Sequence, residues 1–311
     1  MSVSKSITAT AAMWLTEQKN ADGTAKLDLE ANVFGPTGIL NEYTTSATTG
    51  VRNIKVRHLL GHVSGAWGAK TKNAGLLCQD PSLNTPVDTA MTQIIQDTLK
   101  NCPPEVNAMG ATIGPDKQYD YSNFGFSVLG RVLERKSGVS SYEQFVKQSI
   151  LLPMGITQME LAARGTVQKP GEVKYYGGDP YKYNVPRMDA HGGWIATPID
   201  LARFVVHVDG FSPPADILSA ASYTRMTTPS GLPDLENMGL PSVYGLGWAS
   251  NASFVWHAGS LDGTTSILIR SSDGITMNAI SNTRDPAPDI NGMVQNIRAK
   301  VRAWPSYDLF Q

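Results

Sequence analysis

Apolar residues recur every three or four positions in three segments, which is the spacing of an amphipathic α-helix. The first helix is predicted over residues 2–18, the second ends at Gly138, and the third follows Thr197. The third has the clearest start, because Thr197 can cap it, Pro198 suits its first position and Asp200 completes a capping box. The apolar residues that define the three helices are Ile7, Ala11, Trp14 and Leu15, then Val128, Leu129 and Val132, then Leu201, Phe204, Val205 and Val208.

The last third of the chain changes to the alternation that is typical of strands. Strands are predicted at residues 253–257, 265–270 and 275–280, and Asp273-Gly274 predicts a hairpin between the last two. A helix-rich middle followed by strands and one covering helix indicates an α+β fold. That final amphipathic helix, predicted to cover one face of the sheet, carries the stripe Ile290, Val294, Ile297, Val301 and Trp304.

Residues 168–189 interrupt these elements with a segment rich in glycine, proline and tyrosine. We predict a long surface loop, of the kind that often serves as a functional lid. Because the segment has no basic stripe, we expect it to shape a substrate mouth rather than to bind nucleic acid. Its tyrosines are Tyr175, Tyr176, Tyr181 and Tyr183.

The charge and length of the chain exclude several classes of protein. It has 311 residues, 26 Lys and Arg against 27 Asp and Glu, and a net charge of −1. This balance removes the electrostatic attraction that drives binding to nucleic acids and anionic membranes. No apolar run approaches the roughly 18 residues of a membrane span, and the first residues lack the apolar core of a signal peptide. Small molecules or short peptides are therefore the expected partners.

The metal-binding residue types are sparse. Cys78 and Cys102 are the only cysteines, and we expect them to be unpaired; the alternative is one disulfide, which would imply an oxidising compartment. His58 and His62 lie four residues apart but lack the glutamate of a His-Glu-x-x-His motif. We expect them to have a structural role near the site, and we expect no metal or other cofactor.

Two polar motifs lie at predicted helix starts. Ser2 and Lys5 are one helical turn apart, so the amine can assist formation of an alkoxide or take the proton of the hydroxyl. At the second start, Tyr121 could carry a proton, and Asn123 could hold a substrate carbonyl or orient Lys5. Taken alone, each motif favours a helix cap, the first with a solvated lysine beside it, so neither is specific by itself.

A third motif, residues 257–260, ends the first C-terminal strand. It could be a plain strand terminus with a half-buried His257 and a turn glycine. In the functional interpretation, Gly259 leaves room for a substrate along the strand edge, and the backbone N–H of Ser260 donates to an oxyanion.

The order Ser-x-x-Lys, Tyr-x-Asn and His-x-Gly resembles that of the serine beta-lactamase and penicillin-recognising hydrolases. The resemblance is greatest to the class C beta-lactamase-related group, which includes family VIII esterases and D-aminopeptidases. It extends through residues 56–65, 121–138, 192–204 and 244–248, which cover nearly the whole chain in the order of that group. It implies one beta-lactamase/transpeptidase-like domain over residues 1–311, with an antiparallel sheet flanked by helices. The mainly helical subdomain would span about 19–195, and the sheet subdomain 1–18 plus 196–311.

The resemblance also implies a role for each helix-start residue. Ser2 resembles the acylated nucleophile and Lys5 its general base. Tyr121 resembles the second proton carrier, which activates the deacylating water, and Asn123 resembles the positioning amide.

On the strand, His257 stands where many members of the group have lysine, and Gly259 keeps the strand edge clear. The backbone N–H groups of Ser2 and Ser260 would form the oxyanion hole. Ala258 replaces a threonine that is frequent in the penicillin-binding branch. Its missing hydroxyl removes a donor for a carboxylate, which favours neutral esters or amides as substrates.

Members of this group place a helix and two sheet strands before the nucleophile, whereas Ser2 follows Met1 directly. We therefore expect two N-terminal strands to be missing and the last C-terminal strand to be an open edge. The chain would then be a truncated gene product, assemble as a homo-oligomer edge to edge, or receive the missing segment from another chain. Removal of Met1, which a small second residue permits, would leave Ser2 as the first residue.

The expected function is a serine hydrolase that cleaves an ester or amide bond through an acyl-enzyme on Ser2. The enzymatic alternative is beta-lactamase or D-amino-acid peptidase activity. A truncated, non-catalytic homologue used for binding or assembly is the alternative from another class. The expected partners are a small-molecule ester, amide, beta-lactam or short peptide; the compartment is left open, since members of the group are often exported.

Overall fold

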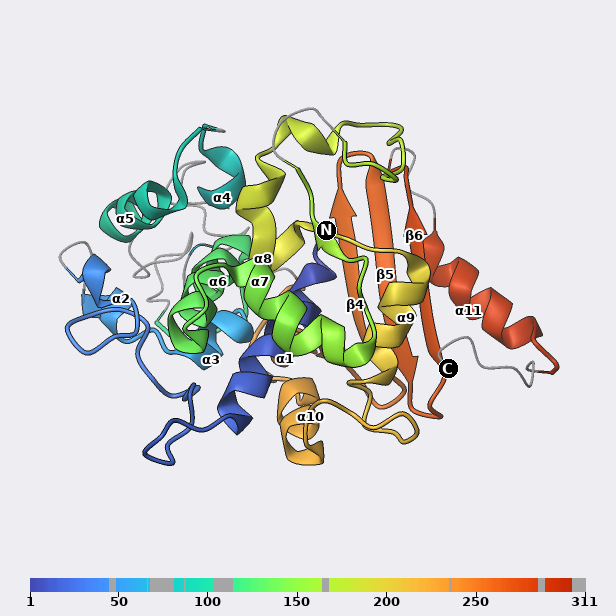
Figure 1. The fold of residues 1–311 in the computed structure, drawn as a ribbon, viewed down its shortest axis with the longest axis horizontal. Helices are drawn as coiled ribbons and strands as arrows, with labels where there is room; N and C mark the ends of the chain where they lie inside the picture. Colours follow the sequence, from blue (N-terminus) through green and yellow to red (C-terminus); the bar gives the residue numbers. More distant parts are fainter. Residues whose placement is uncertain are drawn as a thin grey trace.

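A four-stranded antiparallel sheet occupies one side of the molecule, and most of the helices lie beside it (Figure 1). The computed structural model describes residues 1–44, 49–65, 67, 81–86, 88–102, 114–163, 168–234, 237–284 and 289–303. The spatial order of the sheet is β3-β4-β5-β6, so each strand pairs with its neighbour in sequence. The strands are β3 (Ala249–Ser250), β4 (Phe254–Leu261), β5 (Thr264–Ser271) and β6 (Thr276–Ser281). A separate two-stranded sheet joins β1 (Glu160–Leu161) to β2 (Trp194–Ile195).

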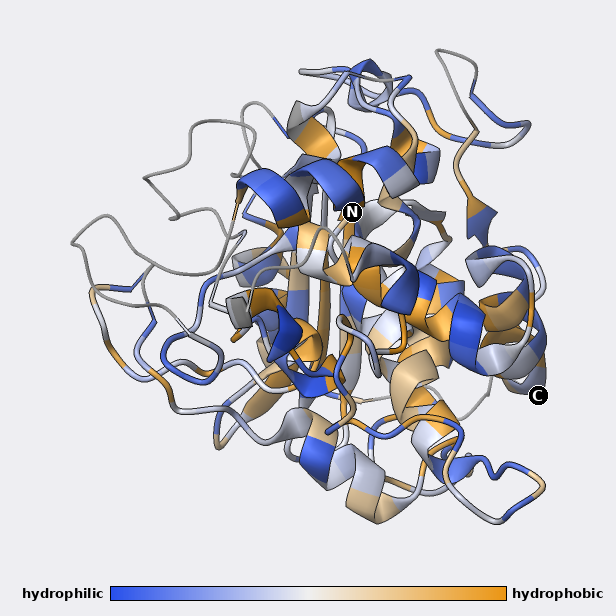
Figure 2. Ribbon diagram, turned by 90° about the vertical axis from the view of Figure 1, so that its left-hand side faces the viewer, coloured by the Kyte–Doolittle hydropathy of each residue, from blue (hydrophilic) through white to orange (hydrophobic). Residues whose placement is uncertain are grey.

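The helices beside the sheet pack around α1 (Ser4–Glu17), whose side chains are almost all buried. α6 (Asn123–Ser137) and α8 (Asp189–Gly192) contact it directly. Helices in Figure 2 alternate between hydrophilic and hydrophobic bands, as expected of helices that bury one face each. The remaining helices of this part are α2 (Thr49–Arg52), α3 (Val56–Leu60), α4 (Pro81–Asn84), α5 (Met91–Asn101) and α7 (Tyr142–Val146).

Two helices cover opposite faces of the sheet, and a third packs against α1. α9 (Pro198–Val206) packs on the face that carries Leu268 and Ile280, within the main core. α11 (Ile290–Lys300) packs on the other face, where Val294 contacts a cluster with Ile267 and Ile269. α10 (Ala220–Thr227) packs against α1. The face of the sheet that α9 covers therefore shares its hydrophobic core with the helices beside the sheet.

The predicted helices are confirmed, with small changes at their ends. α1 begins at Ser4 rather than at Ser2. The Ser122 side chain caps α6, and Gly138, with φ of 73°, ends it. The Thr197–Asp200 capping box starts α9 as predicted. In α11, Ile297 is 56% exposed, so its apolar stripe is only partly buried; Trp304 lies outside the described residues.

The strand predictions are confirmed, but the first was too short. β4 continues four residues past the predicted end, from His257 to Leu261, because β5 pairs with it throughout. The hairpin at Asp273-Gly274 joins β5 to β6 as predicted. Among the described strands β6 is an edge of the sheet; association through this edge, and the division into two subdomains, stay predictions.

Two other predictions need correction. The segment 168–189 is not one open loop: it contains helical turns at Pro180–Lys182 and Val185–Met188, and Tyr181 and Val185 are buried. Its apolar side chains fold it against the rest of the chain. Cys102 is not an unpaired thiol but is disulfide-bonded, which was the alternative; Cys78 lies outside the described residues.

No helix in the described part of the chain is both long and apolar enough to span a bilayer. Among the same residues, no group of three or more His, Cys, Asp or Glu side chains is arranged to hold a metal ion.

Candidate active site

The first turn at α1 brings a hydroxyl and an amine together. Ser2 is half-buried, and Lys5 is completely buried. The Lys5 Nζ donates to Ser2 Oγ at 3.3 Å, to Asn123 Oδ1 at 2.6 Å and to the His191 carbonyl oxygen at 3.1 Å. Asn123 and His191, which lie 118 and 186 positions further along the sequence, therefore orient the amine toward the hydroxyl.

The start of α6 supplies the next two groups. Ser122 is the cap residue, since its Oγ accepts from the Gly125 N–H, and this leaves its neighbours available to the site. Asn123 reaches Lys5, and the Tyr121 ring centroid lies 4.6 Å from the Lys5 Nζ. Ser122 thus caps the helix, whereas its neighbours Tyr121 and Asn123 contact Lys5, as the functional interpretation expects.

The edge of β4 approaches the start of α1. Beyond Trp256, β4 pairs with β5 alone among the described strands, so its other edge faces the helices. A Cβ on Gly259 would lie 2.9 Å from the Met1 Cβ and 3.1 Å from the Ser2 nitrogen. A side chain here would force its neighbours to shift, because the first distance is shorter than real Cβ contacts and the second is tighter than most of them. Ser260 is the next residue along this edge.

His257 lies on the same face of β4 as Gly259, opposite Leu268 of β5. Its Nδ1 lies 2.7 Å from the Ala258 carbonyl oxygen and its Nε2 lies 2.9 Å from the Tyr244 hydroxyl. A carbonyl can only accept, so Nδ1 carries the proton and Nε2 accepts from Tyr244. Burial, reinforced by the nearby Lys5 charge, lowers the pKa of His257 to about 3. The imidazole is therefore neutral near pH 7.

Two further histidines line the same region. Burial and the Lys5 charge hold the pKa of His62 and of His191 well below their usual range. His62 packs 4.3 Å from the Tyr121 ring and accepts from the Ser122 N–H through Nδ1, while His58 bonds Asp116. The predicted structural roles of His58 and His62 are confirmed.

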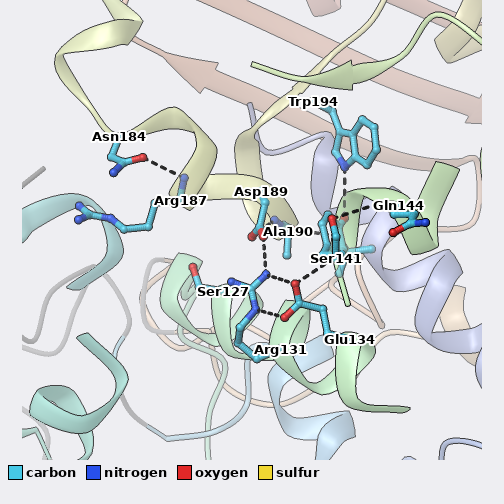
Figure 3. Close-up of polar contacts among 12 residues, drawn as sticks. Ser127, Arg131, Glu134, Ser141, Gln144, Asn184, Arg187, Asp189, Ala190 and Trp194 are labelled. Atoms are coloured by element: carbon cyan, nitrogen blue, oxygen red, sulfur yellow. Dashed lines mark hydrogen bonds and ion pairs between the residues drawn. The ribbon is translucent and has the colours of Figure 1, made fainter. Parts of the chain in front are cut away.

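Behind the site, an ionic cluster holds α8 against α6 (Figure 3). Arg131 of α6 pairs with Asp189 of α8 and, at 2.7 Å, with Glu134. The other oxygen of Asp189 accepts the Ala190 N–H at 2.6 Å. α8 in turn presents the His191 carbonyl to Lys5, so this cluster supports the amine from a distance.

Sequence reasoning missed the His191 carbonyl and the Tyr244 hydroxyl. Tyr244 begins the segment 244–248, which the family resemblance singled out, so that motif could have pointed to it. No side-chain motif could have found His191, because it acts through its backbone oxygen.

A cavity of about 600 Å³ lies beside these groups. Its lining includes Met1 and Gly192 and also Tyr175 and Tyr181, whose phenols both donate to Glu172. The tyrosine-rich segment thus shapes a cavity next to the site, but Ser2 and Lys5 do not line it.

One family model covers nearly the whole chain. The sequence profile of the Beta-lactamase family matches residues 1–301. Penicillin-binding protein 4* of Bacillus subtilis (strain 168) is 26% identical over 250 residues, which cover 70% of this chain and 49% of that protein. The chain thus spans about half the length of this curated relative.

Solved structures share the fold at lower identity. The D-amino acid amidase from Ochrobactrum anthropi SV3, complexed with D-phenylalanine, has a TM-score of 0.66 at 20% identity, covering 96% of this chain and 90% of that one. The octameric penicillin-binding protein homologue from Pyrococcus abyssi has a TM-score of 0.68 at 23% identity, covering 96% and 64%.

Proposed function

Since the chain belongs to the beta-lactamase family, we propose that it is a serine hydrolase of the Ser-x-x-Lys type. It cleaves an ester or amide bond through an acyl-enzyme on Ser2. The observation that carries the proposal is the position of the Lys5 Nζ, 3.3 Å from Ser2 Oγ and 2.6 Å from Asn123 Oδ1. A nucleophile within hydrogen-bond reach of a base, which a third group orients, is the arrangement that covalent catalysis needs.

In the first half of the reaction, Ser2 Oγ attacks the substrate carbonyl carbon while Lys5, in its neutral form, takes the hydroxyl proton. The bond to the leaving group then breaks, and the proton passes to the departing alcohol or amine. Tyr121, stacked beside the Lys5 amine, is the second proton carrier. In the second half Tyr121 passes its phenol proton to the neutral Lys5 amine as it takes a proton from water, whose oxygen attacks the acyl carbonyl. The bond from the acyl carbon to Ser2 Oγ then breaks, Lys5 returns the proton to Ser2 Oγ, and the acid is released.

The developing oxyanion is held by the backbone N–H groups of Ser2 and Ser260. The close approach of β4 at Gly259 supports this role, because a Cβ added there would lie only 3.1 Å from the Ser2 nitrogen. Losing one such donor typically costs about 2.7–4 kcal/mol of transition-state stabilisation. The backbone geometry here therefore matters as much as the side chains.

Beta-lactamase or D-amino-acid peptidase activity is the second candidate. It is supported by the similarity to penicillin-binding protein 4* and by the fold shared with the D-amino acid amidase. Nitrocefin and a short-chain nitrophenyl ester separate the two candidates. We expect faster turnover of the ester; much faster turnover of nitrocefin would favour the second candidate.

A fluorophosphonate probe tests the nucleophile itself. We expect labelling of the wild-type protein and its loss in Ser2→Ala. Ser6→Ala is the matched control, since Ser6 follows Ser2 closely in the sequence and its Oγ donates to the Gly247 carbonyl. Absence of labelling in the wild type, or labelling that survives Ser2→Ala, would favour a non-catalytic homologue used for binding or assembly.

A further inference from the structure

Ser122, which lies between Tyr121 and Asn123 in the sequence, is buried and hydrogen-bonded on three sides. Its N–H donates to His62 Nδ1 at 3.1 Å, and its Oγ donates to the Trp67 carbonyl oxygen at 3.0 Å. The same Oγ caps α6. The positions of His62 and Trp67 therefore fix the serine and, through the backbone, its two neighbours.

His62 and Trp67 share an uncommon backbone conformation. Their φ angles are 55° and 68°, in the left-handed region that bulky side chains rarely adopt. Among the described residues, four non-glycine residues have a positive φ, and two of them hold Ser122. Such strain persists only where the surroundings impose it, and it is concentrated at functional sites.

The Trp67 indole supplies the contacts that impose this conformation. The side chain is 1% exposed, and its Nε1–H donates to the Cys102 carbonyl oxygen at 2.8 Å. Its ring packs edge-on against Phe124 of α6, with centroids 5.2 Å apart, and against Phe34, at 6.3 Å. The acceptor is itself fixed, because the Cys102 N–H donates to the Thr98 carbonyl of α5 and the Cys102 side chain is disulfide-bonded. The indole is thus anchored to the end of α5 and to α6.

The side chain and the backbone of Trp67 matter together. Without its anchored indole, a non-glycine residue at this position would relax toward negative φ, and the carbonyl would turn away from Ser122. Glycine would adopt a φ of 68° without strain, but it would adopt other conformations as readily and has no indole to select this one.

We propose that Trp67 is a positioning residue, whose anchored indole holds its own carbonyl against Ser122. The serine in turn keeps its neighbours directed at the Lys5 amine, which lies 4.6 Å from the Tyr121 ring centroid and 2.6 Å from Asn123 Oδ1. This inference rests on the proposed function, because it concerns the proton transfers of that reaction. Trp67 acts through Ser122 and not on the substrate.

Trp67→Phe tests the proposal, because it keeps a buried aromatic ring but removes the donor to Cys102. Per Ser2 labelled by the fluorophosphonate probe, kcat for a nitrophenyl ester should fall at least about fivefold, since small displacements at a site cost large factors. KM should stay within about twofold, because the displaced groups move protons rather than bind the substrate. A purely structural role would lower the amount of labelled protein but not kcat per labelled site. A smaller fall in kcat, or an effect on KM alone, overturns the proposal.

Trp248→Phe is the matched control. The Trp248 side chain is 2% exposed and its ring stacks on Phe204 with centroids 6.2 Å apart, but the described residues offer its Nε1–H no acceptor. The variant loses the same indole volume without losing a hydrogen bond, so kcat per labelled site should not change. An equal fall in both variants contradicts the proposal, because the effect would then come from core volume alone.

Ser122→Ala tests the path from Trp67 to the site. Without Oγ the contact with the Trp67 carbonyl is lost, so kcat per labelled site should fall in the same way. If Trp67 acts through Ser122, Trp67→Phe should have almost no further effect in the Ser122→Ala background, since residues that act through one contact are not additive. Effects that multiply in the double variant would show that Trp67 acts by another route.

Hydrogen exchange of the indole N–H groups, followed by nitrogen NMR, decides the matter even if Trp67→Phe does not fold. In Ser122→Ala, the Trp67 N–H should exchange at least about tenfold faster than in the wild type, while the Trp248 N–H keeps its rate. Equal rates for the Trp67 N–H in the two proteins rule out the coupling.

Failure of the proposed function would look different. If the wild type is neither labelled at Ser2 nor active on the ester, the function is wrong and the positioning role falls with it. If Ser2 is labelled and the ester is hydrolysed, but Trp67→Phe keeps its kcat, only the positioning role of Trp67 fails.

Discussion

Two basic side chains, the completely buried Lys5 and the partly buried Arg131, contact α8, and their surroundings differ. The contacts described for Lys5 are with neutral oxygens: the Ser2 hydroxyl, the Asn123 amide and the His191 carbonyl. Arg131, which contacts the same helix from α6, pairs with two carboxylates, Asp189 and Glu134 (Figure 3). Burial alone would lower the pKa of Arg131, but these carboxylates raise it above its usual value.

The difference separates a side chain suited to proton transfer, Lys5, from one suited to holding the fold together, Arg131. Carboxylate partners keep the Arg131 guanidinium charged and fix its position, so the cluster can anchor α8 without exchanging protons. Neutral acceptors orient the Lys5 amine in either protonation state, which is what a proton carrier requires. α8 connects the two regions, because it carries both Asp189 and the His191 carbonyl.

The largest expected effect comes from removing the Lys5 amine. Lys5→Met keeps the length of the side chain but cannot move a proton, so kcat/KM for a nitrophenyl ester should fall about 1,000-fold. The melting temperature should not fall appreciably, since an apolar side chain suits a buried site. Steady-state kinetics and thermal melts check this. Activity within tenfold of the wild type would show that another group is the base.

Removing the Arg131 side-chain charge should instead lower the stability and leave the activity nearly unchanged. Arg131→Met leaves Asp189 and Glu134 without their cation, and the free energy of unfolding should fall by about 3–5 kcal/mol. At a temperature where the variant is folded, kcat/KM should stay within tenfold of the wild type.

Urea denaturation of this variant should be run beside a matched control. The triple variant Arg131→Met, Asp189→Asn, Glu134→Gln removes all three charges and should recover most of the stability. A loss below 1 kcal/mol in Arg131→Met would mean that the cluster does not anchor α8.

The smallest expected effect is a pH dependence of the free energy of unfolding that comes from His257, near Lys5. The folded-state pKa of His257 is about 3, against 6.5 for an ordinary histidine. The unfolded chain therefore binds a proton below pH 6.5 that the folded chain refuses, and stability falls as the pH decreases toward 3. The slope contributed by one histidine is at most about 1.4 kcal/mol per pH unit.

Comparing the wild type with His257→Gln isolates this slope, because the carboxylates common to both proteins cancel. Between pH 6 and pH 5, the free energy of unfolding of the variant should decrease less steeply by nearly that amount. Identical slopes would mean that His257 titrates normally in the folded state.

Much of the fold could be predicted because its signals are local. The helix α9 was predicted from Thr197, Pro198 and Asp200, whose contacts lie within three positions. The closeness of Ser2, Lys5 and Asn123 was also expected, but only through the order of motifs in a known family. The tyrosine-rich segment was predicted less well, because its composition does not reveal which side chains will be buried.

By itself the sequence determined the start of α9, the β5–β6 hairpin and the order of the reactive side chains, since each depends on neighbours along the chain. The tertiary structure alone decided that the His191 carbonyl holds Lys5, that Asp189 meets Arg131, and that the Tyr244 hydroxyl donates to His257 Nε2. Every residue offers a carbonyl, and most carboxylate side chains of globular proteins are exposed. Only the packing of distant elements selects the few whose position and burial give them a role.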